Sequence, residues 1–166
     1  MIDKKGQVTV EILLLIGFIL LMSVSLAIIM SNSNELNTAM LSAREGACEG
    51  ISNNGLTILP ENSFKNYSSN SNKKFMLSPK NIKIIKIERT FKGKDAFNKT
   101  RIQLKVYASC PNLKTKEEKE SLGESINYNI RKSITKSFKT ENITNKLYNP
   151  AFSNSYSFTT AQVEWL

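Results

Sequence analysis

The sequence contains no histidine, and this absence excludes several classes of catalytic and metal-binding site. Without histidine the chain cannot form a Ser-His-Asp triad, a Cys-His nucleophile pair or a histidine-ligated metal centre. Two cysteines, Cys48 and Cys110, are too few for a cysteine-only zinc site. The chain has no glycine-rich phosphate-binding loop, and its adjacent acids Glu117 and Glu118 alternate with lysines as on a solvated helix face. We therefore expect neither an enzyme nor a protein that needs a cofactor or a metal.

Glycine and proline are also scarce, at 7 and 4 of 166 residues, which argues against long flexible linkers. The hydrophobic fraction of 40% is enough for one modest domain and a membrane segment. The net charge is +9, but the 23 basic residues are spread along the chain and form no aromatic-interleaved patch of a known binding module. This pattern predicts a basic, solvated surface and no nucleic-acid partner.

One long apolar run stands near the N-terminus. Residues 12–30 read ILLLIGFILLMSVSLAIIM and contain no charged residue in 19 positions. At 1.5 Å per helical residue, this length matches a hydrocarbon core of about 30 Å. Because Lys4 and Lys5 precede the run, the positive-inside rule places the N-terminus in the cytoplasm and everything after Met30 outside.

A cleavable secretory signal is the main alternative for this run. The nearest small-x-small cleavage site is Ser23-Val24-Ser25, but the apolar residues continue beyond it to Met30. Cleavage there would leave an apolar new end, so the pattern favours a retained helix. A secreted basic protein released by such cleavage stays an alternative.

The helical pattern continues beyond the apolar run. Residues 31–34 are polar but include neither proline nor glycine, and apolar positions then recur with i, i+4 spacing at Leu36, Met40, Ala43 and Ala47. The first strong stop signal is Asn53-Asn54-Gly55. We expect one helix over about residues 7–52, roughly 70 Å long, whose second half packs on something outside the membrane.

The residues in front of the run carry a specific order of signals. Residues 4–11 read KKGQVTVE, with two lysines, a glycine, a glutamine and a glutamate ahead of the uninterrupted apolar helix. This order resembles the class III signal peptide of archaeal type IV pilins. It is most similar to the methanogen group, whose mature chains begin with glutamine and carry glutamate at the fifth position. The resemblance covers about residues 3–30.

The resemblance implies a processing step and an assembly. A membrane prepilin peptidase would cut between Gly6 and Gln7, so that residues 1–6, with the leader charges Lys4 and Lys5, are removed. Residues 7–52 would be retained, anchored in the membrane before assembly and forming the filament core afterwards. The partners would be the peptidase and other pilin subunits, and the product a pilin or minor pilin of a surface filament used in attachment.

Glu11 fits the same interpretation. An unpaired acid at mid-membrane costs about 2.5–3.5 kcal/mol, and less near a helix end. Cleavage would free the α-amine of Gln7, and a neighbouring subunit would present that amine to Glu11 on assembly. The alternative is an acid that extends to the lipid headgroups from the first helical turn. The small residues of the run favour close helix packing and are Gly17, Ser23, Ser25 and Ala27.

Residues 53–166 are expected to form an extracellular, β-rich head domain. Residues 53–74 read as a loop. Residues 81–92 predict a strand whose apolar phase changes between Ile84 and Ile85, as at a β-bulge or in a strand buried on both faces. Residues 94–98, preceded by Gly93, predict a hairpin connection.

The rest of the head domain is expected to contain strands and a helix. Residues 101–110 alternate cleanly, and one face carries Ile102, Leu104, Val106, Ala108 and Cys110. Residues 122–138 fit a helix by their four-residue apolar spacing, although residues 126–130 also alternate as in a strand. Residues 156–166 suit a C-terminal strand. The expected fold is α+β: a long N-terminal helix followed by a small antiparallel sheet and one further helix.

Two kinds of covalent modification are also predicted. In an extracellular domain, Cys48 at the end of the long helix and Cys110 at the end of the alternating strand predict a disulfide, with free buried thiols as the alternative. Three N-x-S/T sequons follow the apolar run and are candidates for N-glycosylation at Asn66, Asn98 and Asn142.

Overall fold

The computed structural model describes residues 4–52, 81–111, 113 and 115–166. The chain forms two compact units, residues 1–37 and 38–166, and helix α1 (Lys4–Ser52) contributes to both. The single helix confirms the continuous helix expected to about residue 52. The loop predicted for residues 53–74 lies outside the described residues.

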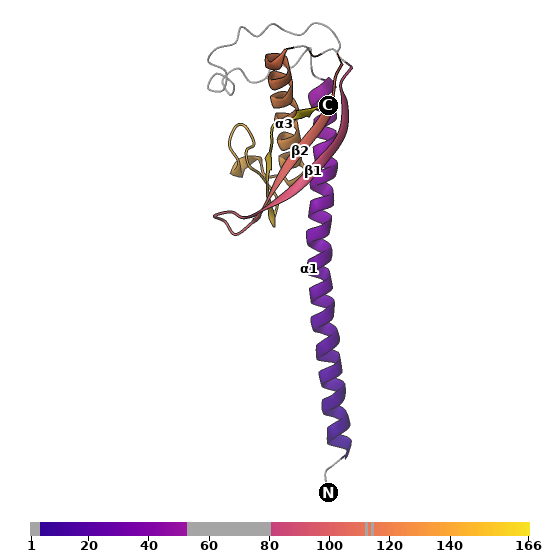
Figure 1. Ribbon diagram of the computed structural model, residues 1–166. Helices are drawn as coiled ribbons and strands as arrows, with labels where there is room; N and C mark the ends of the chain where they lie inside the picture. Colours follow the sequence, from indigo (N-terminus) through magenta and orange to yellow (C-terminus); the bar gives the residue numbers. More distant parts are fainter. Residues whose placement is uncertain (1–3, 53–80, 112, 114) are drawn as a thin grey trace. The chain divides into compact units, whose positions relative to one another are not determined.

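The second unit contains a five-stranded sheet and the second long helix (Figure 1). Its strands are β1 (Lys83–Lys94), β2 (Thr100–Ser109), β3 (Ala151–Phe152), β4 (Tyr156–Thr160) and β5 (Glu164–Trp165). Its helices are α3 (Lys116–Phe138) and the short 3-10 helix η1 (Glu141–Ile143). The strand order is β1-β2-β4-β3, and β5 pairs with β2 further along that strand. This arrangement confirms the α+β class.

The sheet is mixed, which corrects the expected antiparallel sheet. β1 pairs antiparallel with β2 and β3 with β4, whereas both β4 and β5 run parallel to β2. A parallel neighbour requires a crossover, and α3 provides it between β2 and β4. The expected C-terminal strand is also divided, because residues 161–163 separate β4 from β5.

The β1–β2 hairpin forms where the sequence predicts it. Its register shifts between Ile84 and Lys86, so the phase change in the sequence is a bulge and not burial on both faces. A second shift, between Phe91 and Lys94, includes Gly93 at a φ of 82°, a conformation that glycine adopts without strain. On β2 the predicted face is buried, and its members are Ile102, Leu104, Val106, Ala108 and Cys110.

Helix α3 has distinct signals at both ends. Thr115 is the N-cap and accepts a hydrogen bond from the Glu118 backbone N–H at 3.2 Å. Lys139 ends the helix in the left-handed conformation, with a φ of 54°. The four-residue apolar spacing becomes its buried stripe, which is Leu122, Ile126, Ile130 and Ile134. Residues 122–138 are therefore helical.

Within the second unit, the last part of α1 packs closely against α3. A Cβ on Gly46 would lie 2.4 Å from the Asn129 carbonyl oxygen, and one on Gly50 would lie 2.9 Å from the Ile126 Cα. The Oγ atoms of Ser42 and Ser137 are 2.6 Å apart. Rising numbers on α1 therefore meet falling numbers on α3, so the two helices are antiparallel. The alanines on this face, Ala39, Ala43 and Ala47, are fully buried.

Candidate functional site

The first unit presents an apolar helix surface. Every large apolar side chain in residues 12–30 is exposed, with exposed fractions from 48% at Ile16 to 70% at Leu21. Soluble monomeric proteins rarely expose so large an apolar surface, which marks contact with lipid or with another protein. The helix is long and apolar enough to cross a membrane. This surface is the first candidate functional site.

The two serines in this segment do not interrupt its apolar character. Ser23 donates its hydroxyl hydrogen to the Ile19 carbonyl at 2.8 Å, and Ser25 donates to Leu21 at 2.9 Å. Both hydroxyls are thus satisfied within the helix, as in helices whose surroundings offer no water.

The predicted processing residues lie at the start of α1. The helix includes the four residues Lys4, Lys5, Gly6 and Gln7. The structure describes their backbone and not their side chains. Glu11 is exposed and lies directly before the apolar segment. Cleavage after Gly6 and the assembly role of Glu11 stay predictions.

The predicted disulfide is not formed in this structure, where both thiols are free. Cys110 is buried because it continues the inward-facing side of β2, whereas Cys48 is exposed. One residue advances an α-helix by about 100°, so Cys48 is turned away from the buried stripe that includes Ala47. The spacing in the sequence placed each cysteine at the end of its element but did not reveal this rotation.

Two of the three sequons are described, and both asparagines are exposed. Asn98 lies in the β1–β2 turn at a φ of 61°, and its Oδ1 accepts a hydrogen bond from Lys94 Nζ at 2.9 Å. Asn142 lies in η1. Asn66 is outside the described residues. Glycosylation at all three stays a prediction.

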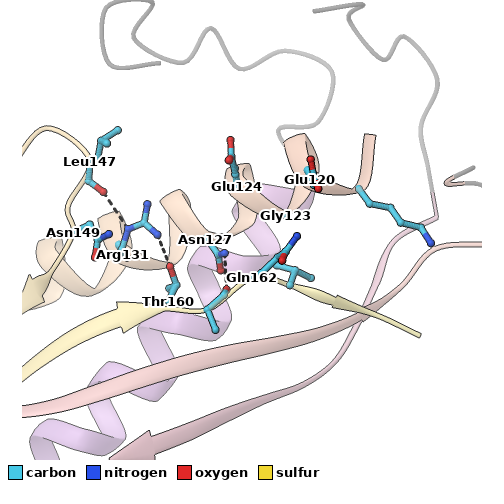
Figure 2. A pocket seen from close by; sticks show the side chains of 12 residues that line it. Glu120, Gly123, Glu124, Asn127, Arg131, Leu147, Asn149, Thr160 and Gln162 are labelled. Carbon is cyan, nitrogen blue, oxygen red and sulfur yellow. Dashed lines mark hydrogen bonds between the residues drawn. The ribbon is translucent and has the colours of Figure 1, made fainter. Parts of the chain in front are cut away.

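The second unit has a pocket of about 330 Å³ beside α3 (Figure 2). Part of its lining comes from residues 160–163, around the connection from β4 to β5, and eight of its twelve lining residues have polar side chains. Arg131 fixes one wall: its Nε donates to the Leu147 carbonyl at 3.1 Å, and its Nη1 donates to the Thr160 hydroxyl. Other polar side chains that line the pocket are Lys119, Glu120, Glu124, Asn149 and Gln162.

Asn127 forms part of this pocket with one polar atom unsatisfied. Its Nδ2 donates to the Ala161 carbonyl at 2.8 Å, while its buried Oδ1 has no hydrogen-bond partner among the described residues. A buried acceptor without a donor costs about 1–3 kcal/mol, so the site favours a water or a ligand that brings an N–H or O–H. Among the described residues, no cluster of acids or cysteines is placed to hold a metal ion.

Sequence reasoning did not find this pocket. Its lining comes from α3, from residues 147–149 and from residues 160–163, which are distant in the chain and share no motif. Asn127 lies about 100° around α3 from the stripe residue Ile126, so the apolar spacing of the helix does not single it out.

Comparisons with protein-family models, with curated proteins and with solved structures find no match to this chain. A functional assignment therefore depends on its own residues and geometry.

Proposed function

We propose that this chain is a structural subunit, a pilin or minor pilin, of an archaeal type IV pilus-like surface filament. The observation that carries the proposal is the apolar surface of residues 12–30, exposed on a helix that continues unbroken to Ser52. The order of residues 4–11 supports it, because a leader, a cleavage position and an acid precede that surface in the order that such a subunit needs.

The proposed mechanism uses one surface in two environments. Before assembly, residues 12–30 lie in the membrane with the N-terminus in the cytoplasm. A prepilin peptidase then removes residues 1–6, and the retained helix exchanges lipid for the helices of other subunits. Interfaces between such helices rely on close packing, which Gly17 permits because it has no side chain to hold a neighbouring helix away. Residues 53–166 are displayed outside, where the filament attaches to surfaces or cells.

Glu11 would set the register of the polymer. A carboxylate that stays ionised inside an apolar bundle is stabilised by a partner of opposite charge, and the freed amine of Gln7 on a neighbouring subunit would be such a partner. The amine exists only after cleavage, so processing and assembly would occur in a fixed order.

The processing step predicts one specific mass. The mature protein isolated from its native cells is expected to begin at Gln7, as measured by intact-protein and N-terminal peptide mass spectrometry. Replacing Gly6 with valine is the matched control, since a branched side chain at the cleavage position should leave a chain that keeps residues 1–6. A wild-type protein that starts at Met1, or at Leu26 after a conventional signal cleavage, would contradict the proposal.

The pocket beside α3 favours a second candidate, a single-pass membrane-anchored protein that binds a ligand at the cell surface. The supporting observation is the buried, unsatisfied Oδ1 of Asn127. This candidate predicts an uncut chain with Lys4 and Lys5 in place and a monomer in detergent. The same N-terminal measurement, combined with the oligomeric state, separates the two candidates.

A further inference from the structure

The positive charge of the protein is concentrated in the β1–β2 hairpin. Residues 83–109 contain eight lysines and arginines and two acids, which gives a net charge of +6 out of +9 for the whole chain. In the sequence the basic residues are spread along the chain, but the pairing of β1 with β2 brings these eight together on one hairpin.

The two ends of the hairpin differ in how far their positive charges are neutralised. At the end of β2 that pairs with β5, Lys86 forms an ion pair with Glu88, and Lys105 forms one with Glu164. Both ammonium groups also lie over the Tyr107 ring, at 4.3 Å and 5.1 Å from its centroid. The hydrogen bonds to Glu88 and Glu164 raise the pKa values of Lys86 and Lys105. Two of the three lysines at this end, Lys86 and Lys105, are thus neutralised locally, and the third is Lys83.

The opposite end carries an excess of positive charge. We call residues 89–101 the hairpin tip; its basic residues are Arg89, Lys92, Lys94, Lys99 and Arg101. Its one acid, Asp95, accepts hydrogen bonds from the backbone N–H groups of Phe97 and Lys99, each at 2.9 Å, and so orders the turn. Lys99 Nζ donates to the Asn154 carbonyl at 2.8 Å, which holds the tip against the β3–β4 turn.

Two aromatic side chains stand out from the hairpin tip. Phe97 is 75% exposed, more than any other large apolar side chain among the described residues, and Phe91 is 58% exposed. The Phe97 ring is held at a right angle to Phe152, with 6.3 Å between the centroids. Exposed phenylalanine surrounded by lysine and arginine is typical of protein surfaces that lie in the headgroup region of a bilayer.

A series of contacts within the second unit connects the hairpin tip to the part of α1 that belongs to this unit. Lys99 is joined to Asn154, Thr140 donates to the Phe152 carbonyl at 2.9 Å, and α3 ends beside Ser42 of α1. Thr38, where the unit begins, follows Met30 by eight residues. This short connection tethers the second unit to the membrane that would hold residues 12–30.

We propose that the hairpin tip docks on the anionic headgroups of the membrane that holds α1, with Phe97 at the interface. The lysines and arginines supply the attraction to anionic lipid, worth about a fivefold change in binding for each charge near the surface. The exposed Phe97 and Phe91 give the tip an apolar part that can enter the headgroup region of a bilayer, which favours a lipid surface as the anionic partner. The inference needs α1 in a membrane but needs neither cleavage nor polymerisation, so it can fail independently of the proposed function.

The test places a fluorophore beside Phe97. Full-length protein with Cys48→Ser and Ala96→Cys, produced without glycosylation because a glycan at Asn98 would cover the tip, is labelled with an environment-sensitive dye. It is reconstituted in vesicles of phosphatidylcholine alone or of equal parts phosphatidylcholine and phosphatidylglycerol. We expect a blue-shifted, stronger emission with phosphatidylglycerol that is reversed by salt. A label at Leu166→Cys, at the opposite end of β2, should not respond.

Charge variants test the surface itself. Lys92→Gln with Lys94→Gln should lower the ratio of docked to undocked protein by about 25-fold. Lys83→Gln with Lys116→Gln removes the same charge away from the tip and should leave the ratio unchanged. Equal emission in both kinds of vesicle, equal effects of the two double variants, or an emission response to a single-stranded oligonucleotide in place of the anionic vesicles would overturn the proposal.

Discussion

Replacing Gly46 with alanine is expected to destabilise the second unit by about 3 kcal/mol or more. The added methyl group would lie 2.4 Å from the Asn129 carbonyl oxygen and 2.8 Å from both the Asn129 carbonyl carbon and the Ile130 Cα. These are backbone atoms of α3, which cannot rotate away as the end of a flexible side chain can. The helices would have to separate, and the fully buried Ala43 and Ala47 on the same face of α1 would lose contacts.

The measurement is denaturant unfolding of the full chain in detergent, followed by the fluorescence of Trp165, the protein's single tryptophan. Gly17→Ala is the matched control, because a Cβ there meets nothing within 4 Å and alanine is a better helix former by about 1 kcal/mol. Gly50→Ala, whose Cβ would lie 2.9 Å from the Ile126 Cα, should also destabilise the unit, by less than Gly46→Ala. A Gly46→Ala protein as stable as the wild type would contradict the close packing of α1 on α3.

Replacing Glu11 with glutamine is expected to leave cleavage after Gly6 intact and to reduce incorporation into filaments about a hundredfold or more. The substitution keeps the size and hydrogen-bonding capacity of the side chain and removes its charge. If the amine of a neighbouring Gln7 is buried against Glu11, the variant leaves that amine uncompensated, and breaking a buried pair in this way costs about 3–5 kcal/mol. About 1.4 kcal/mol corresponds to a factor of ten in the equilibrium.

Two readouts separate assembly from processing. Mass spectrometry should find Gln7 as the first residue of the variant, and electron microscopy should find few or no filaments. Glu45→Gln is the matched control, since Glu45 is an exposed acid on the same helix, within the second unit. Filaments of normal number from the Glu11→Gln protein, or a loss of filaments with Glu45→Gln as well, would remove the register role of Glu11.

The sequence alone predicted the features that depend on neighbouring residues. The period of the apolar residues gave the long helix and α3, the alternation of residues 101–110 gave β2, and the change of phase beside Ile84 gave the bulge. The exposed apolar surface of residues 12–30 follows from composition, because an all-round apolar helix has no polar face to present to water. The resemblance in residues 4–11 is likewise a property of the sequence, and its consequences for function stay proposals.

Only the tertiary structure decided which distant segments meet. The direction of β4 and β5 beside β2 depends on where α3 returns the chain, and no local pattern encodes that choice. Three further features depend on atoms from segments far apart in sequence. They are the close approach of α3 to Gly46, the unsatisfied Oδ1 of Asn127, and the ion pair that neutralises Lys105 at one end of the hairpin. The free thiols also depend on tertiary packing, because the face of α1 that packs on α3 determines that Cys48 points away from the core. Local periodicity fixes how each segment folds, whereas packing geometry determines which of its atoms meet a partner.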